Sequence, residues 1–164
     1  MILRKPLHCI ALAFAFAAVP ALLFSPAFSA DGKNLPGTVL IKSPHSYKVL
    51  VQRLDAAVKN NKMGLVTRAS ATLGARNLGI TIPGNMVVGV YHPRFAVRML
   101  KASVPAGIEA PIRFYITENA DGTASLSWRS PSSVFAPYRS ADLDAMAREL
   151  DRIFARIAAE ATGG

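Results

Sequence analysis

Apolar and polar positions recur with two different periods along the chain, and turn residues separate the segments. Apolar and β-branched residues at 38–42 predict a first strand. Leucine, alanine and valine at helical spacing predict a helix over 47–61, which Gly64 is expected to end in a left-handed conformation. A short strand at 65–68 and a small-residue helix over 70–78 are predicted next.

The clearest signal is a hairpin in the second half of the chain. A mostly apolar run at 86–91 predicts a strand inside a sheet, and Pro93 begins a helix over 93–102. Apolar and polar residues alternate over 112–117 and again over 124–129, on either side of an Asn-Ala-Asp-Gly turn. This alternation predicts two antiparallel strands with one buried face.

The last segment completes the predicted fold. A stretch rich in proline and serine at 130–138 predicts a loop. Ser140 caps a long helix whose apolar residues form one stripe and whose first turn is acidic. The order of elements predicts a single α+β domain over 38–162, with helices packed on one face of a mainly antiparallel sheet.

Residues 1–29 have the three parts of a secretory signal peptide. Arg4 and Lys5 give a charged start, an apolar core follows over 9–24, and small residues end the segment at Ser29. The sequence therefore predicts an exported protein, periplasmic or secreted.

The end of this leader leaves two alternatives open. Cleavage after Ser29 places small side chains at both positions that a peptidase reads, whereas cleavage after Ala30 places Phe28 at one of them. The other alternative is an uncleaved anchor helix, because the apolar core approaches the roughly 20 residues that span a bilayer. Pro20 argues against a continuous helix. Residues 30–37 then form a short lead-in to the domain.

Charge and cysteine content limit the classes of function. The formal net charge is +9, and removal of Arg4 and Lys5 with the leader would lower it by two. The basic residues are scattered, which argues against nucleic-acid binding and is typical of mild attraction to anionic lipid, polysaccharide or phosphate. The one cysteine, Cys9, lies in the leader, so the mature chain is expected to have no disulfide and no thiolate metal site. We expect no cofactor.

Recognisable catalytic motifs are missing from the sequence. Its serines lie in no G-x-S-x-G or S-x-x-K motif, and it contains no phosphate-binding glycine loop. No catalytic residue is assigned on this basis. Tyr115, Trp128 and Tyr138 are suited to lining a small apolar cleft, but aromatic residues of a hairpin more often belong to the core.

Two histidines remain after the leader, and both precede predicted helices. His45 and His92 therefore suit a capping role, in which an imidazole nitrogen meets a free amide of the first helical turn. The alternative is an enzyme in which the two histidines share one pocket as acid and base or as metal ligands. That site would be incomplete, because no carboxylate or thiol is placed beside them, and no metal site is predicted.

A basic cluster at one helix start is the sharper candidate for a binding site. Arg94, Arg98 and Lys101 recur at helical spacing, and Tyr91 and His92 precede them. Arginines beside a helix start are suited to binding carboxylate, phosphate or sulfate. The alternative is an ordinary solvated basic face. Together with His45, these residues form the hypothetical ligand site.

Several stretches, taken in order, resemble one known family. They are Ile41–Ser46, Ala75–Gly79, Val87–Pro93, Gly107–Arg113 and the turn at Asp121-Gly122. Over roughly Val39 to Pro131 the chain resembles the domain-of-unknown-function 302 family of small bacterial α+β proteins. The resemblance implies that fold and commonly a homodimer, and it implies no established activity.

This sequence departs from the family pattern at two places. Many members carry an Asp-His pair before the alanine-rich helix, and the matching positions here are Ser70 and Ala71. The family's Phe-Gly-Asn-Pro turn is Val90–Pro93 here. If the Asp-His pair does chemistry or binds metal in relatives, this chain has lost that function.

Three hypotheses follow from the sequence. The favoured one is an exported, non-enzymatic module that binds a small anionic ligand or a protein partner. The second is a periplasmic enzyme that uses His45 and His92. The third is a basic protein that associates with the surface of the cell envelope.

Overall fold

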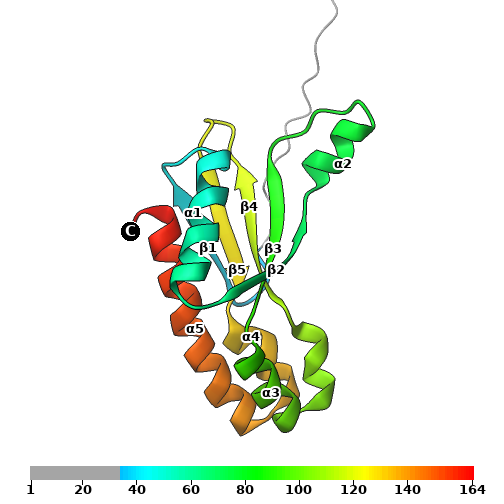
Figure 1. Cartoon of the computed structure of the whole chain (residues 1–164), viewed down its shortest axis with the longest axis vertical. Helices are drawn as coiled ribbons and strands as arrows, with labels where there is room; N and C mark the ends of the chain where they lie inside the picture. Colours follow the sequence, from blue (N-terminus) through cyan, green and yellow to red (C-terminus); the bar gives the residue numbers. More distant parts are fainter. Residues whose placement is uncertain (1–33) are drawn as a thin grey trace, which may run out of the picture. The chain divides into compact units, whose positions relative to one another are not determined.

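The structure, a computed structural model, describes residues 34–164 (Figure 1). The proposed leader and its two cleavage sites lie outside these residues. Residues 33–164 form one compact unit. The elements follow one another as β1 (Thr38–Ser43), α1 (Tyr47–Asn60), β2 (Gly64–Ala69), α2 (Ala71–Asn77), β3 (Asn85–Tyr91), α3 (Pro93–Ala102), η1 (Val104–Glu109), β4 (Ile112–Glu118), β5 (Ala124–Arg129), α4 (Pro131–Phe135), η2 (Ala136–Tyr138) and α5 (Ala141–Thr162).

The five strands form one sheet in the order β1-β5-β4-β3-β2. Every neighbouring pair is antiparallel, and the predicted hairpin is the β4-β5 pair, in which Phe114 faces Trp128 and Ile116 faces Leu126. The predicted strand at 86–91 is internal, because β3 has β4 on one side and β2 on the other. The α+β fold predicted from the sequence is confirmed.

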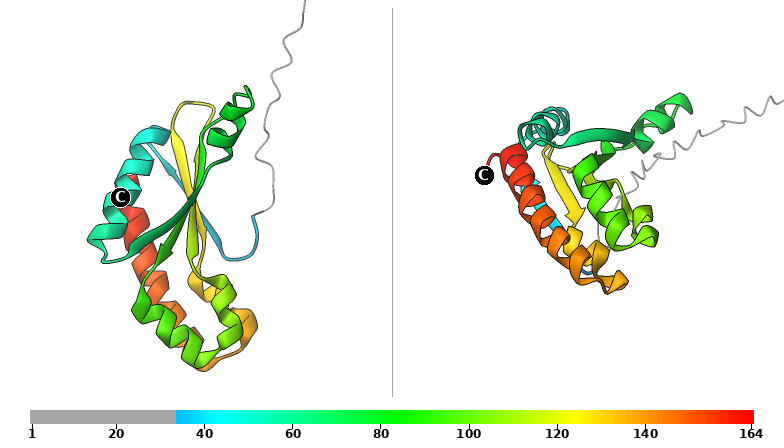
Figure 2. Two further views of the ribbon diagram at one scale, coloured as in Figure 1. Left: turned by 45° about the vertical axis from the view of Figure 1, so that its right-hand side comes forward. Right: turned by 60° about the horizontal axis from the view of Figure 1, so that its bottom comes forward.

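Helices α1 and α5 lie side by side over one face of the sheet (Figures 1 and 2). The face that they cover carries the alternating apolar residues of the hairpin, so Phe114 and Ile116 are fully buried. Leu54 of α1 and Phe154 of α5 are also fully buried, and the Phe154 ring stacks on Phe114 with ring centroids 4.8 Å apart. The core therefore lies between the sheet and these two helices.

Helices α3 and α4 extend the core beyond the end of the sheet (Figure 1). Phe95 and Met99 of α3 are buried, as are Phe135 of α4 and Met146 of α5, and all four belong to the same core cluster. This placement brings the start of α3 close to α5, which matters for the candidate site.

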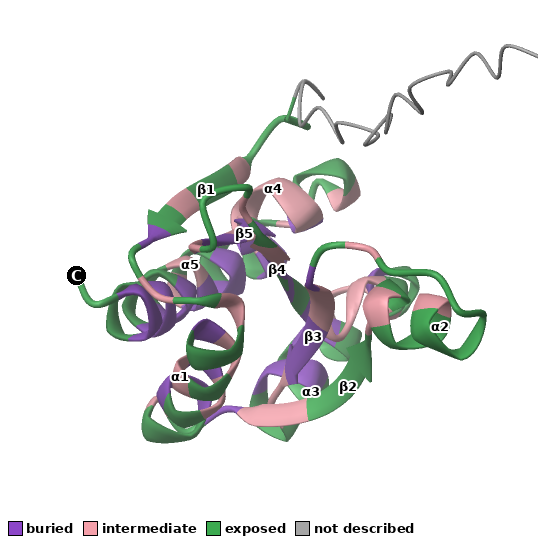
Figure 3. Ribbon diagram, turned by 90° about the horizontal axis from the view of Figure 1, so that it is seen from above, coloured by how far each residue is buried: buried purple, intermediate pink, exposed green. Residues whose placement is uncertain are grey.

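The opposite face of the sheet is open at its centre. Tyr115 of β4 is 42% exposed and Leu40 of β1 is 50% exposed, whereas the residues before and after Tyr115 are buried. Figure 3 shows exposed residues on β1 and buried residues on α5 and β3. The alternation of the hairpin thus divides a packed face from a face that solvent reaches.

The predicted loop over 130–138 is wrong, since this stretch forms α4 and η2. The same residues that suggested a loop begin a short helix. Ser130 caps α4 by accepting a hydrogen bond from the Ser133 amide, and Pro131 occupies a first-turn position where no amide is needed. Asp151 of α5 accepts a bond of 2.9 Å from the Ser132 amide and ties α4 to the last helix.

The predicted left-handed residue after α1 is Lys62, with a φ of 58°, and not Gly64. Gly64 instead begins β2, opposite Tyr91 of β3.

No helix within residues 34–164 combines the length and the apolarity that crossing a membrane requires.

Candidate functional site

His92 is the residue that begins α3, and it caps that helix as the sequence predicts. Its Nδ1 atom accepts a hydrogen bond of 3.1 Å from the backbone amide of Arg94. Pro93 occupies the first turn of the helix, and the imidazole lies edge-on to the Phe95 ring at 6.0 Å. The histidine therefore fixes the start of α3 and the direction in which the following side chains leave it.

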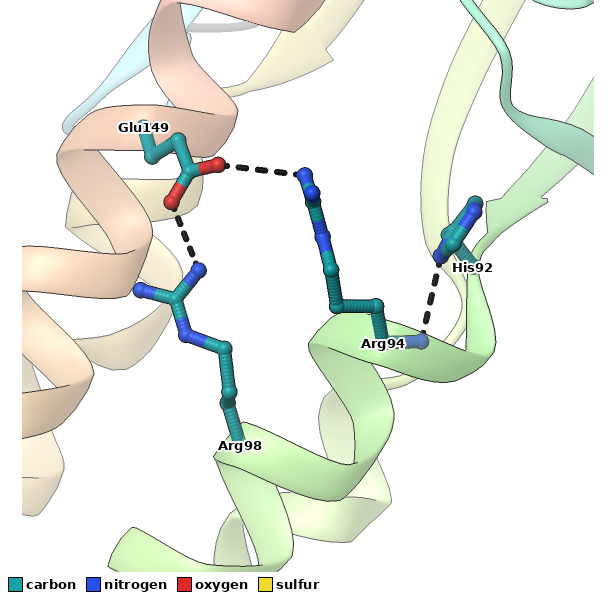
Figure 4. Close-up of polar contacts among 4 residues, drawn as sticks. All are labelled: His92, Arg94, Arg98 and Glu149. Carbon is teal, nitrogen blue, oxygen red and sulfur yellow. Dashed lines mark hydrogen bonds and ion pairs between the residues drawn. The ribbon is translucent and has the colours of Figure 1, made fainter.

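Arg94 and Arg98 both reach across to one carboxylate on α5 (Figure 4). Arg94 Nη2 lies 3.3 Å from Glu149 Oε1, and Arg98 Nη1 lies 2.6 Å from Glu149 Oε2. The guanidinium carbons also lie 4.9 and 5.6 Å from the centre of the Phe95 ring. Sequence reasoning placed the two arginines on one face and missed Glu149, which joins them.

The arginines change the acidity of this carboxyl group. The hydrogen bond from Arg98 makes the largest contribution and lowers the pKa of Glu149 below its ordinary value. Burial opposes this shift, and the charges of Arg98, Arg94 and Arg152 add to it. A carboxylate with a lowered pKa stabilises the fold above the pKa of the unfolded chain. This contribution is lost as pH falls through the folded-state pKa.

We therefore expect Glu149→Gln to lower the free energy of unfolding at neutral pH and to have little effect in acid. The side chain is about a third exposed, so the loss at pH 7 is expected to be at most about 1 kcal/mol. Urea unfolding of the variant and the parent at about pH 7 and about pH 3, on either side of the ordinary carboxyl pKa, measures the difference. Equal destabilisation at both pH values would contradict the assignment of this effect to the ionised carboxylate.

A hollow of about 290 Å³ opens beside this ion pair. We call it the basic pocket, and its lining comes from the loop between α1 and β2, the start of α3 and the middle of α5. Four of its lining side chains are cationic and one is a carboxylate. The lining residues are Asn61, Lys62, Met63, His92, Arg94, Phe95, Glu149, Arg152, Ile153 and Arg156.

The cations of the basic pocket are only partly neutralised. Glu149 pairs with Arg94, and Arg156 Nε lies 3.4 Å from Asn61 Oδ1. None of the ion pairs within residues 34–164 includes Lys62, Arg152 or Arg156. The pocket therefore carries an excess of positive charge, and Lys62, Arg152 and Arg156 are exposed.

The structure places His45 outside the basic pocket. His45 precedes α1 at the end of that helix remote from Lys62, so the roughly 20 Å length of a 14-residue helix separates it from the basic pocket. Its Nε2 atom is buried without a hydrogen-bond partner among the described residues, beside Gly163 at the end of α5. The two histidines are not brought into one site, and this geometry does not support an enzyme that uses both.

Arg98, Tyr91 and Lys101 do not line the basic pocket. Tyr91 lines a smaller hollow of about 30 Å³ that also contacts His92 and buried residues of α3. Lys101 is exposed near the end of α3. Within residues 34–164 no group of three histidine, cysteine or acidic side chains is arranged to hold a metal ion.

The positions matching the family's Asp-His pair have a structural role in this chain. Ser70 caps α2 by accepting a hydrogen bond from the Leu73 amide, and its hydroxyl donates to the Asn85 carbonyl at 2.6 Å. The Ala71 amide donates to the Asn85 side chain at 3.0 Å. These contacts attach α2 to the start of β3 and leave no acid–base pair there.

Comparison with known proteins agrees with this fold. The family described as "Domain of unknown function DUF302" matches residues 39–161. The chain belongs to this family. The DUF302 match extends through α5, which is well beyond the stretch that resembled the family on sequence motifs alone, and α5 carries Glu149, Arg152 and Arg156.

A solved DUF302 structure and several curated proteins are similar to the chain. The crystal structure of an uncharacterized conserved DUF302 protein from Bacillus stearothermophilus has a TM-score of 0.70 at 16% sequence identity, covering 77% of this chain and 99% of that one. Two proteins named fluoride-specific ion channel FluC 1, from Brucella suis biovar 1 and Brucella abortus biovar 1, are 25% identical over 96 residues, which is 58% of this chain. The matched region is 38% and 36% of those proteins, so the chain spans less than two fifths of their length.

Proposed function

We propose that this protein is an exported, non-enzymatic module that binds a small anion in the basic pocket. The observation that carries the proposal is the imbalance of charge around one hollow, where four cationic side chains from two helices and a loop meet a single carboxylate. Guanidinium groups favour carboxylate and phosphate oxygens because their N–H donors form a planar fork.

Two further observations support an anion as the ligand. Glu149 already holds Arg94, which fixes one wall of the pocket, while Arg152 has no ion-pair partner among residues 34–164 and is available to a ligand. The names of the Brucella relatives describe proteins that conduct fluoride, a small anion. Fluoride therefore belongs among the probes, beside inorganic phosphate and sulfate.

Anion titrations with a matched pair of variants test this proposal. Arg152→Gln removes a lining charge, whereas Arg148→Gln removes the same charge from an exposed position of α5 outside the pocket. We expect calorimetric titration with phosphate, sulfate or fluoride at about 0.1 M inert salt, where the Debye length is about 10 Å, to show saturable binding. Arg152→Gln is expected to weaken this binding about tenfold, the loss of one charge-assisted contact. We expect Arg148→Gln to change the affinity by less than about twofold, because screening weakens distant charges.

Two results would contradict the proposal. One is the absence of saturable binding for all three anions. The other is an equal loss in both variants, since an equal loss would show that the anions respond to net charge and not to the pocket.

A further inference from the structure

We propose a second binding site, for an aromatic carboxylate, on the open face of the sheet. A hollow of about 270 Å³ lies there, and we call it the sheet-face hollow. Strands β3, β4, β5 and β1 form its floor, and η1 and α4 contribute one wall. Its lining residues are Thr38, Val87, Glu109, Ile112, Arg113, Tyr115, Ser127, Trp128, Arg129 and Val134.

Two arginines lie next to each other across the strands of this hollow. In the β4-β5 register Phe114 faces Trp128 and Tyr115 faces Ser127, so the next residues along, Arg113 and Arg129, face each other. Side chains opposite one another on neighbouring strands are about 5 Å apart at Cβ, where two like charges destabilise a sheet.

Neither arginine is neutralised within the described chain. None of the ion pairs formed by residues 34–164 includes Arg113 or Arg129, and both residues are exposed. A carboxylate bound between the two guanidinium groups would relieve their repulsion and would accept the planar forks of both.

The hollow also offers an apolar surface for the body of a ligand. Tyr115 is 42% exposed on this face, and Val87 lies directly opposite it on β3. Trp128 is among the residues that line the hollow, and its ring packs against Phe114 on the buried face of the sheet. A flat ring placed on Tyr115 and Val87 buries apolar surface that the fold leaves open.

One acidic side chain sets the orientation of the ligand. Glu109 in the wall accepts a hydrogen bond of 3.0 Å from the Tyr138 hydroxyl, which restrains its carboxylate. Burial, followed by the bond to Glu109, raises the pKa of Tyr138, so the hydroxyl remains a donor at neutral pH. Because Glu109 repels an anion, the ligand's carboxylate is directed to the pair of arginines and its ring toward Tyr115 and Val87.

The sheet-face hollow and the basic pocket are independent sites. They share no lining residue, and the basic pocket is formed by the loop after α1 and by helices α3 and α5, whereas the strands form the floor of the sheet-face hollow. A variant in one site is therefore a control for the other, and failure of either proposal leaves the other unaffected.

Trp128 makes the test direct, because it is the chain's single tryptophan and it lines the hollow. The purified protein is titrated with benzoate, and with acetate, which carries the same charge without a ring, while tryptophan fluorescence is recorded. We expect saturable quenching by benzoate and a much weaker response to acetate. Arg113→Gln and Arg129→Gln are each expected to weaken benzoate binding about tenfold, the loss of one charge-assisted contact.

Variants outside the hollow provide the control. Arg148→Gln and Arg152→Gln are expected to leave benzoate binding within about twofold of the parent, because neither residue lines the hollow. Circular dichroism of the four variants confirms that each one is folded. The proposal is overturned if benzoate gives no saturable change up to about 10 mM, a concentration at which a site with a Kd of about 1 mM is about nine-tenths occupied. It is also overturned if acetate binds as well as benzoate, or if all four variants lose affinity alike.

Discussion

Replacing Phe154 with alanine is expected to destabilise the protein by about 3–5 kcal/mol, the cost of emptying an aromatic site in a packed core. Phe154 is fully buried, and its ring stacks on Phe114 at 4.8 Å with an angle of 20° between the ring planes. Phe114 in turn contacts Trp128 at 5.4 Å. The substitution therefore removes the contact through which α5 is held against the centre of the sheet.

Chemical denaturation followed by tryptophan fluorescence measures this loss, because Trp128 belongs to the same aromatic group. Ile108→Ala is the matched surface control, since Ile108 is 83% exposed and its truncation is expected to change the free energy of unfolding by less than about 0.5 kcal/mol. A loss near 1 kcal/mol in Phe154→Ala would show that α5 is not anchored through this ring.

The anchoring role of α5 connects the core to the candidate site. Phe154 and Ile153 face inward, while Glu149, Arg152 and Arg156 recur at helical spacing and line the basic pocket. The spacing of three and seven residues places them along one side of the helix. The apolar stripe predicted from the sequence therefore determines where these charges are held.

The sequence predicted the part of the candidate site that is formed by residues close together along the chain. Pro93 and the basic residues after it predicted both the helix and a common face for Arg94 and Arg98, because helix starts depend on neighbouring residues. Glu149, which pairs with both arginines, is 51 positions beyond Arg98 along the chain. Only the packing of α3 against α5 brings Glu149 next to Arg98. The sequence signal available for these α5 residues was the helical spacing of Glu149, Arg152 and Arg156 beside the apolar stripe of that helix.

The error over 130–138 has a related cause. Proline and serine are typical of loops, but Pro131 and Ser130 are also the residues that begin helices. What decides between a loop and a helix is the burial of Phe135 and the hydrogen bond that the Ser132 amide donates to Asp151, and both depend on α5. Local composition predicted the hairpin correctly because its alternating pattern and its turn are contained in one short stretch.

Replacing Gly89, in the middle of β3, with alanine is expected to have the second largest effect on the free energy of unfolding, after Phe154→Ala. A Cβ atom at Gly89 would lie 2.1 Å from Thr67 Oγ1 and 2.7 Å from Pro111 Cγ, both closer than nonbonded atoms approach. The threonine hydroxyl is able to rotate away, but the proline ring lies against an internal strand and has little freedom. We expect Gly89→Ala to lower the free energy of unfolding by about 1–3 kcal/mol, as overpacking usually does.

The same substitution at Gly74 is the control, because no atom of residues 34–164 lies within 4 Å of a Cβ atom at that helical position. Gly74→Ala is expected to be neutral or stabilising by up to about 1 kcal/mol, the usual gain of alanine over glycine in a helix.

In urea unfolding, adding Thr67→Ala to Gly89→Ala should recover part of the lost free energy of unfolding, because it removes the clash with Thr67 and leaves the clash with Pro111. If the double variant is no more stable than Gly89→Ala, the proline alone limits the space. Equal behaviour of Gly89→Ala and Gly74→Ala would show that β3 shifts freely relative to β2 and β4. Such a shift would also move Val87 and Tyr115, so this pair of variants tests how rigidly the sheet holds the floor of the sheet-face hollow.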